Sequence, residues 1–144
     1  LSAFYGILKP MDGVTPYRLE MQAKAEIEET TNLYDYWGDR LYHSVIDDSR
    51  TIINLASKEY SKCIERYLSD KDNYITITFC ELSGDKLVTK GTYAKMARGE
   101  MVRFMAENNI ENPVDIQKFD RLGYTFRGSL SSETEYVFER KIIK

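Results

Sequence analysis

Residues 74–82 read YITITFCEL, and this stretch decides the fold. Its isoleucines and Phe79 alternate with threonines, which is the period-two pattern of a strand with one buried face. The turn sequence SGDK at 83–86 and the apolar run LVT at 87–89 follow directly. Together these residues predict a β-hairpin whose two faces differ in polarity.

The rest of the chain supplies further strands and several helices. The apolar run TIINLAS at 51–57 predicts a strand buried on both faces. Amphipathic periodicity near 100° per residue predicts helices over residues 31–48, 58–68 and 92–108, and Pro113 opens a short one through 119. Two tail strands are predicted at 124–126 and 136–140, and residues 1–22 read as two short extended pieces joined by a turn. This mixed order predicts an α/β or α+β fold, with a mixed β-sheet and packed helices.

Composition limits both the number of domains and the class of partner. The chain has 144 residues, of which 42% are hydrophobic, so residues 1–144 are expected to form one domain. Its 20 Lys and Arg residues against 23 Asp and Glu residues exclude a protein that coats nucleic acid through bulk positive charge. Any anion site must therefore be a local patch. No apolar run is long enough to span a bilayer, so no membrane partner is predicted.

The cysteines and the histidine limit the chemistry. Cys63 and Cys80 are 17 residues apart without a CxxC pattern, so a reducing cytoplasm is expected. A single histidine, His43, predicts neither a metal site nor a cofactor, and no GxSxG-type turn supports hydrolysis with this histidine as the base. His43 is expected on the exposed side of its helix. The sequence assigns no catalytic residue.

The predicted helix over 92–108 carries the strongest signal for a site. Its apolar residues fall on one arc, whereas Lys95, Arg98, Gly99 and Arg103 fall on the opposite one. A glycine inside a helix costs about 1 kcal/mol relative to alanine, so Gly99 requires a reason. One reading is that a ligand such as nucleic-acid phosphate approaches Gly99 between the flanking cations. The other is a solvated helix face on which Gly99 packs under a neighbouring element.

The segment NLASKEY, residues 54–60, is a second candidate site. Asn54 is polar within an apolar strand and is expected to bond to backbone or to a ligand. Ser57 stands where a helix N-cap is needed, although the same helix start could receive an anion. Glu59 in the first turn either compensates the helix dipole or, if buried, serves as a general base. Tyr60 falls on the apolar stripe of the same helix.

A third candidate is the Pro-flanked segment that contains Tyr17 and Arg18. Arg18 either pairs with Glu20 or binds phosphate. The eleven tyrosines of the chain could also stack bases, although those on helical stripes are expected in the core.

Five strings in fixed order identify a resemblance to a known family. They are FYGILKPMDGVTPYRLEM, LYDYWGD, NLASKEY, YAKMARGEMVR and GYTFRGSLSSETEYVFERK. In this order they resemble the C-terminal half of the YaaA family of bacterial peroxide-stress proteins. Because the chain opens on Leu1 rather than on Met, we expect a piece of a longer protein whose N-terminal half is a partner of this one.

The resemblance implies a cytoplasmic protein that limits free intracellular iron and oxidative DNA damage, and that binds DNA through a positively charged cleft. It implies Arg18, Lys58, Lys95, Arg98 and Arg103 as cleft cations, with Tyr17, Asn54, Ser57, Glu59, Tyr60, Tyr93 and Gly99 shaping the site. Met96 stands where the family commonly has a further basic residue. The helix-hairpin-helix element and the iron ligands that the resemblance suggests are not evident in these residues.

An enzyme acting on a nucleobase or nucleotide at the 54–60 turn is the alternative hypothesis, because ligands of α/β folds often bind at strand-to-helix turns. A packing platform for the N-terminal half is a third. The sequence leaves open whether the chain forms a homo-oligomer.

Overall fold

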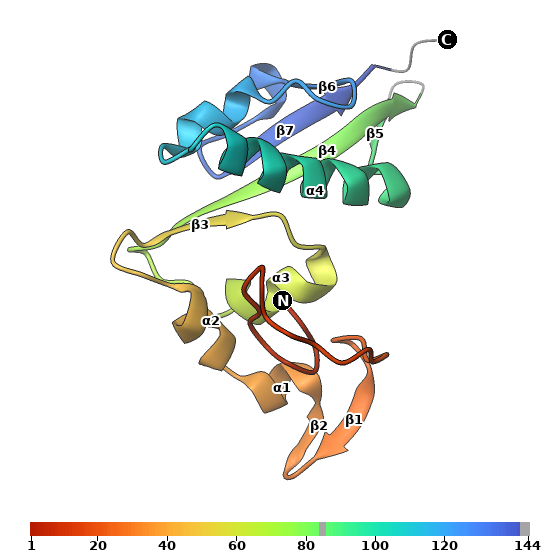
Figure 1. The fold of residues 1–144 in the computed structure, drawn as a ribbon, viewed down its shortest axis with the longest axis vertical. Coiled ribbons are helices and arrows are strands. Elements are labelled where there is room, and N and C mark those ends of the chain that lie inside the picture. Colours follow the sequence, from red (N-terminus) through yellow and green to blue (C-terminus); the bar gives the residue numbers. More distant parts are fainter. Residues whose placement is uncertain (84–85, 142–144) are drawn as a thin grey trace. The chain divides into compact units, whose positions relative to one another are not determined.

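The computed structural model describes residues 1–83 and 86–141, which form two compact units. Unit 1 contains residues 1–52 and 56–73, and unit 2 contains residues 53–55 and 74 onward. Figure 1 shows the elements of both. Whether the two units fold as one domain stays a prediction, and each is described by itself.

Unit 2 is built on a mixed sheet, as predicted. The strands of this sheet are β3 (Thr51–Asn54), β4 (Asn73–Ser83), β5 (Lys86–Val88), β6 (Tyr124–Phe126) and β7 (Glu135–Arg140). They belong to unit 2 except for residues 51, 52 and 73, which are counted in unit 1. The order is β3-β4-β7-β6, and β5 pairs with the end of β4. The central pair β4 and β7 is parallel, with Thr76 opposite Glu135 and Glu81 opposite Arg140, whereas β4–β5 and β6–β7 are antiparallel.

The strands of the predicted hairpin are confirmed as β4 and β5, and residues 84–85 of its turn lie outside the described residues. The strand predicted at 51–57 ends at Asn54. Its burial on both faces was wrongly predicted, because β3 lies at the end of the sheet order and Thr51, Ile52 and Ile53 are half-buried.

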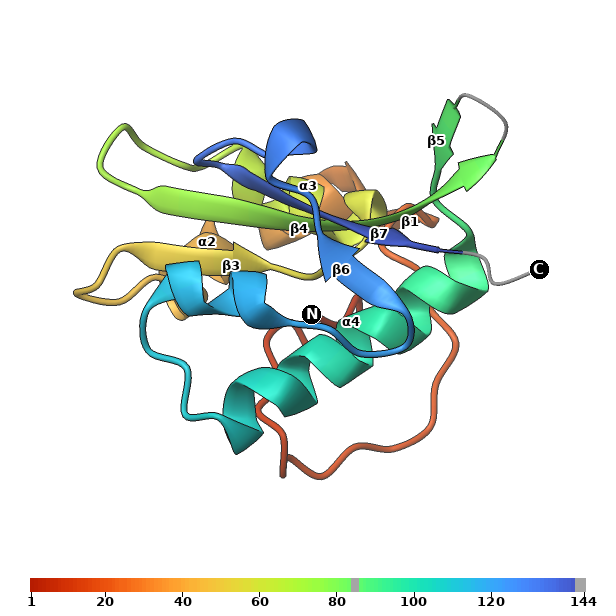
Figure 2. The same ribbon diagram turned by 90° about the horizontal axis from the view of Figure 1, so that it is seen from above.

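One face of the unit 2 sheet is covered by two helices. They are α4 (Gly91–Glu107) and the 3₁₀ helix η1 (Pro113–Lys118), which lie on the same side in Figure 2. A second 3₁₀ turn, η2 (Gly128–Leu130), separates the two tail strands. The core between sheet and helices contains the side chains predicted to share one face of β4 and one arc of α4, which are Ile75, Ile77, Phe79, Ala94, Ala97, Met101 and Phe104. Phe138 of β7 is buried with them. The predictions for both helices and both tail strands are confirmed to within a residue or two.

Unit 1 contains a small hairpin and three short helices. The hairpin pairs β1 (Lys24–Ile27) with β2 (Thr30–Asn32), and the helices are α1 (Leu33–Trp37), α2 (Arg40–Val45) and α3 (Lys58–Glu65). Asn32 caps α1, since its side-chain oxygen accepts the N–H of Asp35 at 3.0 Å.

Two predictions for unit 1 were wrong. The helix predicted over 31–48 is broken at Gly38, because this residue takes a left-handed φ of 54° and donates its N–H back to Tyr34. Without a Cβ, glycine reaches that conformation at little cost and ends the first helix there. Residues 1–22 contain no paired strand apart from an isolated bridge between Ser2 and Gly6. Side-chain bonds hold this segment instead, as where the Ser2 hydroxyl accepts the N–H of Tyr5 at 2.9 Å.

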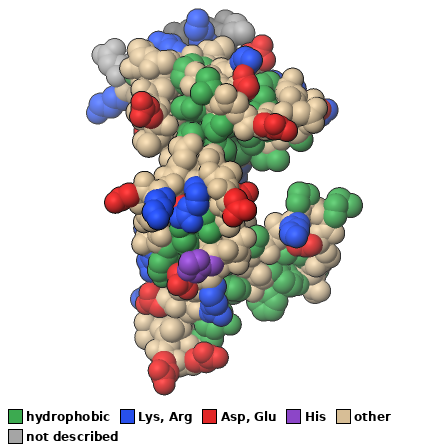
Figure 3. Space-filling model, turned by 90° about the vertical axis from the view of Figure 1, so that its left-hand side faces the viewer, with side chains coloured by type: hydrophobic (Ala, Val, Ile, Leu, Met, Phe, Trp, Pro, Cys, Tyr) green, Lys and Arg blue, Asp and Glu red, His purple; other side chains and the backbone are tan. Residues whose placement is uncertain are grey.

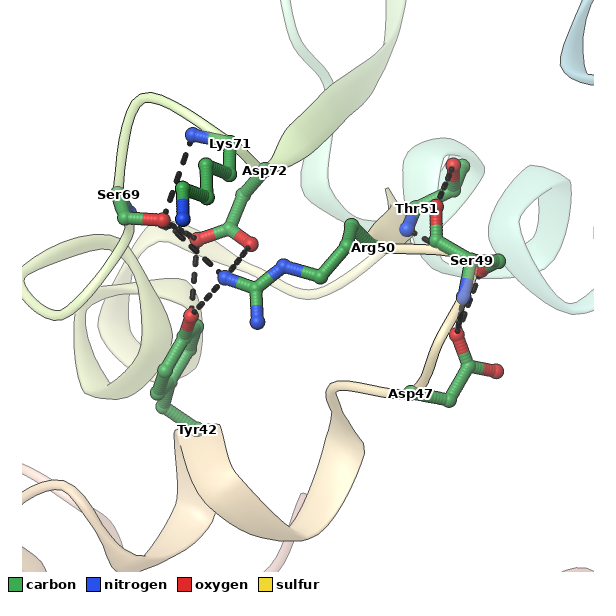
Figure 4. Close-up of polar contacts among 8 residues, drawn as sticks. All are labelled: Tyr42, Asp47, Ser49, Arg50, Thr51, Ser69, Lys71 and Asp72. Carbon is green, nitrogen blue, oxygen red and sulfur yellow. Dashed lines mark hydrogen bonds and ion pairs between the residues drawn. The ribbon is translucent and has the colours of Figure 1, made fainter.

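A polar network connects the loop before β3 to the loop after α3 (Figure 4). The buried carboxylate of Asp72 pairs with Arg50 at 2.5 Å and accepts hydrogen bonds from the Tyr42 hydroxyl at 2.9 Å and the Ser69 N–H at 2.7 Å. Burial alone would raise the pKa of Asp72, but these hydrogen bonds and Arg50 hold it below its ordinary value. Arg50 has a φ of +54°, a conformation that costs an ordinary residue about 1–2 kcal/mol. The ion pair and hydrogen bonds of this network offset that cost.

Candidate functional site

Helix α4 presents two distinct surfaces, as its sequence predicts. Ala94, Ala97, Met101 and Phe104 are buried against the unit 2 sheet, and Met105 is half-buried beside them. The predicted arc of Lys95, Gly99 and Arg103 is exposed, and Arg98 is half-buried at its edge. The candidate site therefore lies on the solvent side of α4.

The cations in the N-terminal half of α4 differ from the other cations of this helix in their ion pairing. Neither Lys95 nor Arg98 forms an ion pair with any residue that the structure describes. The Nε–H group of Arg98 is moreover buried, and no described atom accepts a hydrogen bond from it. A buried donor without an acceptor costs about 1–3 kcal/mol, so this guanidinium is suited to an acceptor that the described chain does not provide.

The C-terminal half of α4 is electrically balanced. Arg103 pairs with Glu107 at 2.7 Å, and Arg121 reaches both Glu100 and Glu107 at 2.8 Å. The side-chain hydrogen bonds from Arg103 and Arg121 lower the pKa of Glu107. Of the predicted cleft cations on α4, Arg103 is thus the one already held by a carboxylate.

Gly99 has no packing reason within the described chain. Apart from the helix itself, no described atom lies within 4 Å of the point where a Cβ would stand. The interpretation that Gly99 packs under a neighbouring element is therefore wrong for the part of the chain in view. The approach of a ligand to its bare backbone stays a prediction.

A charged cluster that sequence reasoning missed lies beside the start of α4. Glu81 is fully buried, and its carboxylate pairs with Lys90 at 3.0 Å and with Arg140 at 2.6 Å. The Arg140 guanidinium also stacks on Tyr93, with its central carbon 3.6 Å from the ring centroid. A signal was present, because Glu81 continues the inward series of β4 after Phe79 and places an ionisable group on the core face.

The N-terminal end of α4 thus carries an excess of positive charge. Among the described residues, Lys90, Lys95, Arg98 and Arg140 lie at or near this end, where Glu81 pairs with Lys90 and Arg140, and the free N–H groups of the helix start add a partial positive charge. Acidic and basic side chains are by contrast interspersed over the face shown in Figure 3, where the exposed His43 is purple. A local patch is what the net charge of -3 allows.

In unit 1, the segment around Tyr17 and Arg18 is exposed. The Tyr17 hydroxyl is hydrogen-bonded to Ser2, and its ring packs on Phe4 and Tyr5 with centroids 5.4 and 5.6 Å away. Arg18 pairs with no carboxylate among the described residues, so the intramolecular pair with Glu20 is not formed. The predicted site residue Arg18 is therefore available to an anion.

The start of α3 holds four further predicted site residues, all in unit 1. Ser57 is the N-cap residue, but its side chain makes no capping bond, contrary to the capping interpretation. Lys58 pairs with Glu65 at 2.7 Å. Glu59 is half-buried and accepts the N–H of Gln22 at 3.4 Å, and burial raises the pKa of Tyr60, with smaller contributions from Glu59 and Tyr17. The structure thus brings both Glu59 and Tyr17 within electrostatic range of Tyr60.

Asn54 lies in unit 2 and is buried. Its side-chain amide donates to the Thr76 hydroxyl at 3.3 Å, so a neighbouring strand supplies one partner where backbone or a ligand was expected. The residues of the 54–60 segment therefore divide between the two units, with Asn54 in one and Ser57, Lys58, Glu59 and Tyr60 in the other.

Neither a metal-binding cluster nor a membrane-spanning helix is present among the described residues. Within residues 1–83 and 86–141, no three His, Cys, Asp or Glu side chains gather closely enough to hold a metal ion. Over the same ranges, no helix has the length and apolar character needed to cross a bilayer.

Comparison with known proteins identifies the family. Residues 1–130 match the family model described as peroxide stress protein YaaA. The chain belongs to the YaaA family. Its relatives include proteins named UPF0246 protein. The one from Agathobacter rectalis is 80% identical over 99% of this chain and 57% of its own length. Those from Lachnoclostridium phytofermentans and Desulfitobacterium hafniense are 55% and 54% identical over 96% of this chain and 54% and 55% of their own lengths. The chain thus spans little more than half the length of these YaaA-family relatives.

Proposed function

We propose that this YaaA-family protein binds DNA through the N-terminal half of α4, and that this binding underlies protection against peroxide stress. The observation that carries the proposal is the pair formed by Lys95 and Arg98, which have no carboxylate partner among the described residues. The buried, unpaired Nε of Arg98 favours an acceptor oxygen from outside the chain. Phosphate supplies such oxygens, and a guanidinium binds them in a fork.

The choice of DNA rather than another polyanion rests on the family resemblance. Phosphate contacts position a protein on DNA without reading sequence, and the exposed Lys95 and half-buried Arg98 beside a bare helix backbone suit that role. We propose Arg18 and Lys58 of unit 1 as further phosphate contacts, and Arg103 as a weaker one because Glu107 already holds it. The surface ion pairs of Lys58 and Arg103 contribute little and can be exchanged for phosphate.

The proposal extends to the cell. We place the protein in the cytoplasm, where DNA binding limits oxidative DNA damage, and we include the restriction of free intracellular iron that the resemblance implies. The description of the matching family model, peroxide stress protein YaaA, supports a role in peroxide stress.

A charge-matched pair of variants tests the proposal. Lys95→Gln with Arg98→Gln should lower DNA affinity about tenfold or more, because a hydrogen bond to a charged group contributes about 1.5–3 kcal/mol. Lys24→Gln with Lys118→Gln removes the same charge from exposed residues outside the candidate site and should leave affinity nearly unchanged. Fluorescence anisotropy with a labelled duplex gives the affinities, and survival and chelatable iron in peroxide-treated cells give the effect in vivo. Equal losses in both double variants would mean that α4 contributes only bulk charge.

A further inference from the structure

Resting on the proposed DNA binding, we propose that Tyr93 and Arg140 form a stacking platform for an unpaired base of the bound nucleic acid. The guanidinium of Arg140 lies over the ring of Tyr93, with its central carbon 3.6 Å from the ring centroid. Such a cation–π pair is a recurrent surface for a base, because every base presents a π-face whatever its identity.

The buried carboxylate of Glu81 holds the Arg140 side of the platform in place. The carboxylate of Glu81 is fully buried and forms an ion pair with Arg140 at 2.6 Å, and its other oxygen pairs with Lys90 at 3.0 Å. Glu81 and Arg140 are also partners in the parallel register of β4 and β7, so the sheet fixes their spacing. A platform with its side chains already ordered loses little conformational entropy when a ligand binds.

The ring remains open to a ligand. The side chain of Arg140 is only 20% exposed, whereas Tyr93 is 41% exposed although the guanidinium covers part of its ring. Tyr93 lies in the first turn of α4, where the helix start contributes free N–H groups. An aromatic ring that is exposed while its cationic neighbour is half-buried and held by an ion pair is better suited to a stacking ligand than to filling the core.

The position of Tyr93 fits one strand that crosses the solvent side of α4. Tyr93 and Arg98 are about 7.5 Å apart along the helix axis and about 140° apart around it. Between them on the longer, solvent-side arc of about 220° lie Lys95, Gly99 and the exposed Met96, because the shorter arc holds the buried Ala94, Ala97 and Met101. A strand whose phosphates meet Arg98 and Lys95 passes over the bare backbone of Gly99 and follows this arc for about 20 Å before it reaches Tyr93, which takes about six nucleotide steps of 3.4 Å.

The geometry requires a base that is free to stack. In a duplex both faces of each base are covered by its neighbours, so the platform selects a base that is unpaired, as in a bulge or a gap. We therefore expect tighter binding to a duplex with one bulged base than to the same duplex with an abasic site at the bulge. The expected ratio is about 5-fold to 150-fold, which corresponds to stacking one base.

The test uses 2-aminopurine as the bulged base. Stacking on Tyr93 should quench its fluorescence on binding to the unmodified chain and to Tyr93→Phe, which keeps the ring. Tyr93→Leu should lose both the quenching and the preference for the bulged base. Tyr36→Leu is the matched control, because Tyr36 of unit 1 also lies under an arginine, with the guanidinium carbon of Arg40 4.8 Å from its centroid.

The outcomes separate the platform from the proposed function. Equal affinity for the bulged and abasic duplexes, with the Lys95→Gln and Arg98→Gln loss intact, would overturn the platform and leave DNA binding standing. Unchanged quenching in Tyr93→Leu would do the same. Failure of the unmodified chain to bind either duplex would overturn the proposed function, and the platform with it.

Discussion

Gly99 is the residue at which stability and proposed function oppose each other. It lies inside a 17-residue helix, where glycine costs about 1 kcal/mol relative to alanine. Within the described chain nothing approaches it closely enough to require the absence of a Cβ. The sequence signals that this residue is special, but it cannot distinguish a buried neighbour from an external ligand, because both favour glycine for the same steric reason.

Replacing Gly99 with alanine should therefore stabilise the protein and weaken DNA binding. We expect Gly99→Ala to raise the free energy of unfolding by about 1 kcal/mol, because α4 gains helix propensity without a clash. Its Cβ would stand between Lys95 and Arg103 on the exposed arc, so DNA affinity should fall severalfold. Urea titration and fluorescence anisotropy measure the two effects. A variant that is more stable and binds DNA as well as the parent would show that no ligand approaches Gly99.

At the scale of elements, sequence patterns located the long helix and the sheet but not their ion pairs. The alternation in β4 and the apolar stripe of α4 are local, so both elements were predictable. The pair between Glu81 and Arg140 joins strands 59 residues apart and depends on a register that no local pattern encodes. The hairpin of β1 and β2 was missed because its turn uses Glu28 at a φ of +52°, where a glycine or asparagine would have signalled it.

The ion pairs at the C-terminal end of α4 should appear in the pH dependence of stability. Arg103 and Arg121 lower the pKa of Glu107 from its ordinary value of 4.5, so the unfolded chain binds the proton more tightly than the folded one. The stabilisation is present above pH 4.5 and is lost as the pH falls through the lower folded value. Between pH 5 and 3, Glu107→Gln should lose stability less steeply than the parent.

Urea titrations across that range measure the effect. Glu133→Gln is the control, because Glu133 is exposed and forms no ion pair with any residue of the described ranges. It should retain the slope of the parent. An identical slope in Glu107→Gln would mean that the network contributes nothing to folding.

At the scale of the whole molecule, the mixed sheet with its helices was predictable, whereas the division into two units was not. The division falls within the apolar run 51–57, where residues 53–55 belong to unit 2 and the residues on either side to unit 1. Composition and periodicity describe such a run only as a strand, because they do not record which neighbours it pairs with. The candidate site residues therefore divide between Tyr17, Arg18 and the start of α3 in unit 1, and Asn54 and α4 in unit 2.

The salt dependence of DNA binding tests the central claim most directly. Each phosphate that a cation neutralises steepens the fall of log K with log salt by about 0.9. We predict that the slope for Lys95→Gln with Arg98→Gln is shallower than that of the parent by about 1.8, while the slope for Lys24→Gln with Lys118→Gln is unchanged. An affinity that is insensitive to salt, or a slope that Lys95→Gln and Arg98→Gln leave unaltered, would contradict phosphate binding by α4.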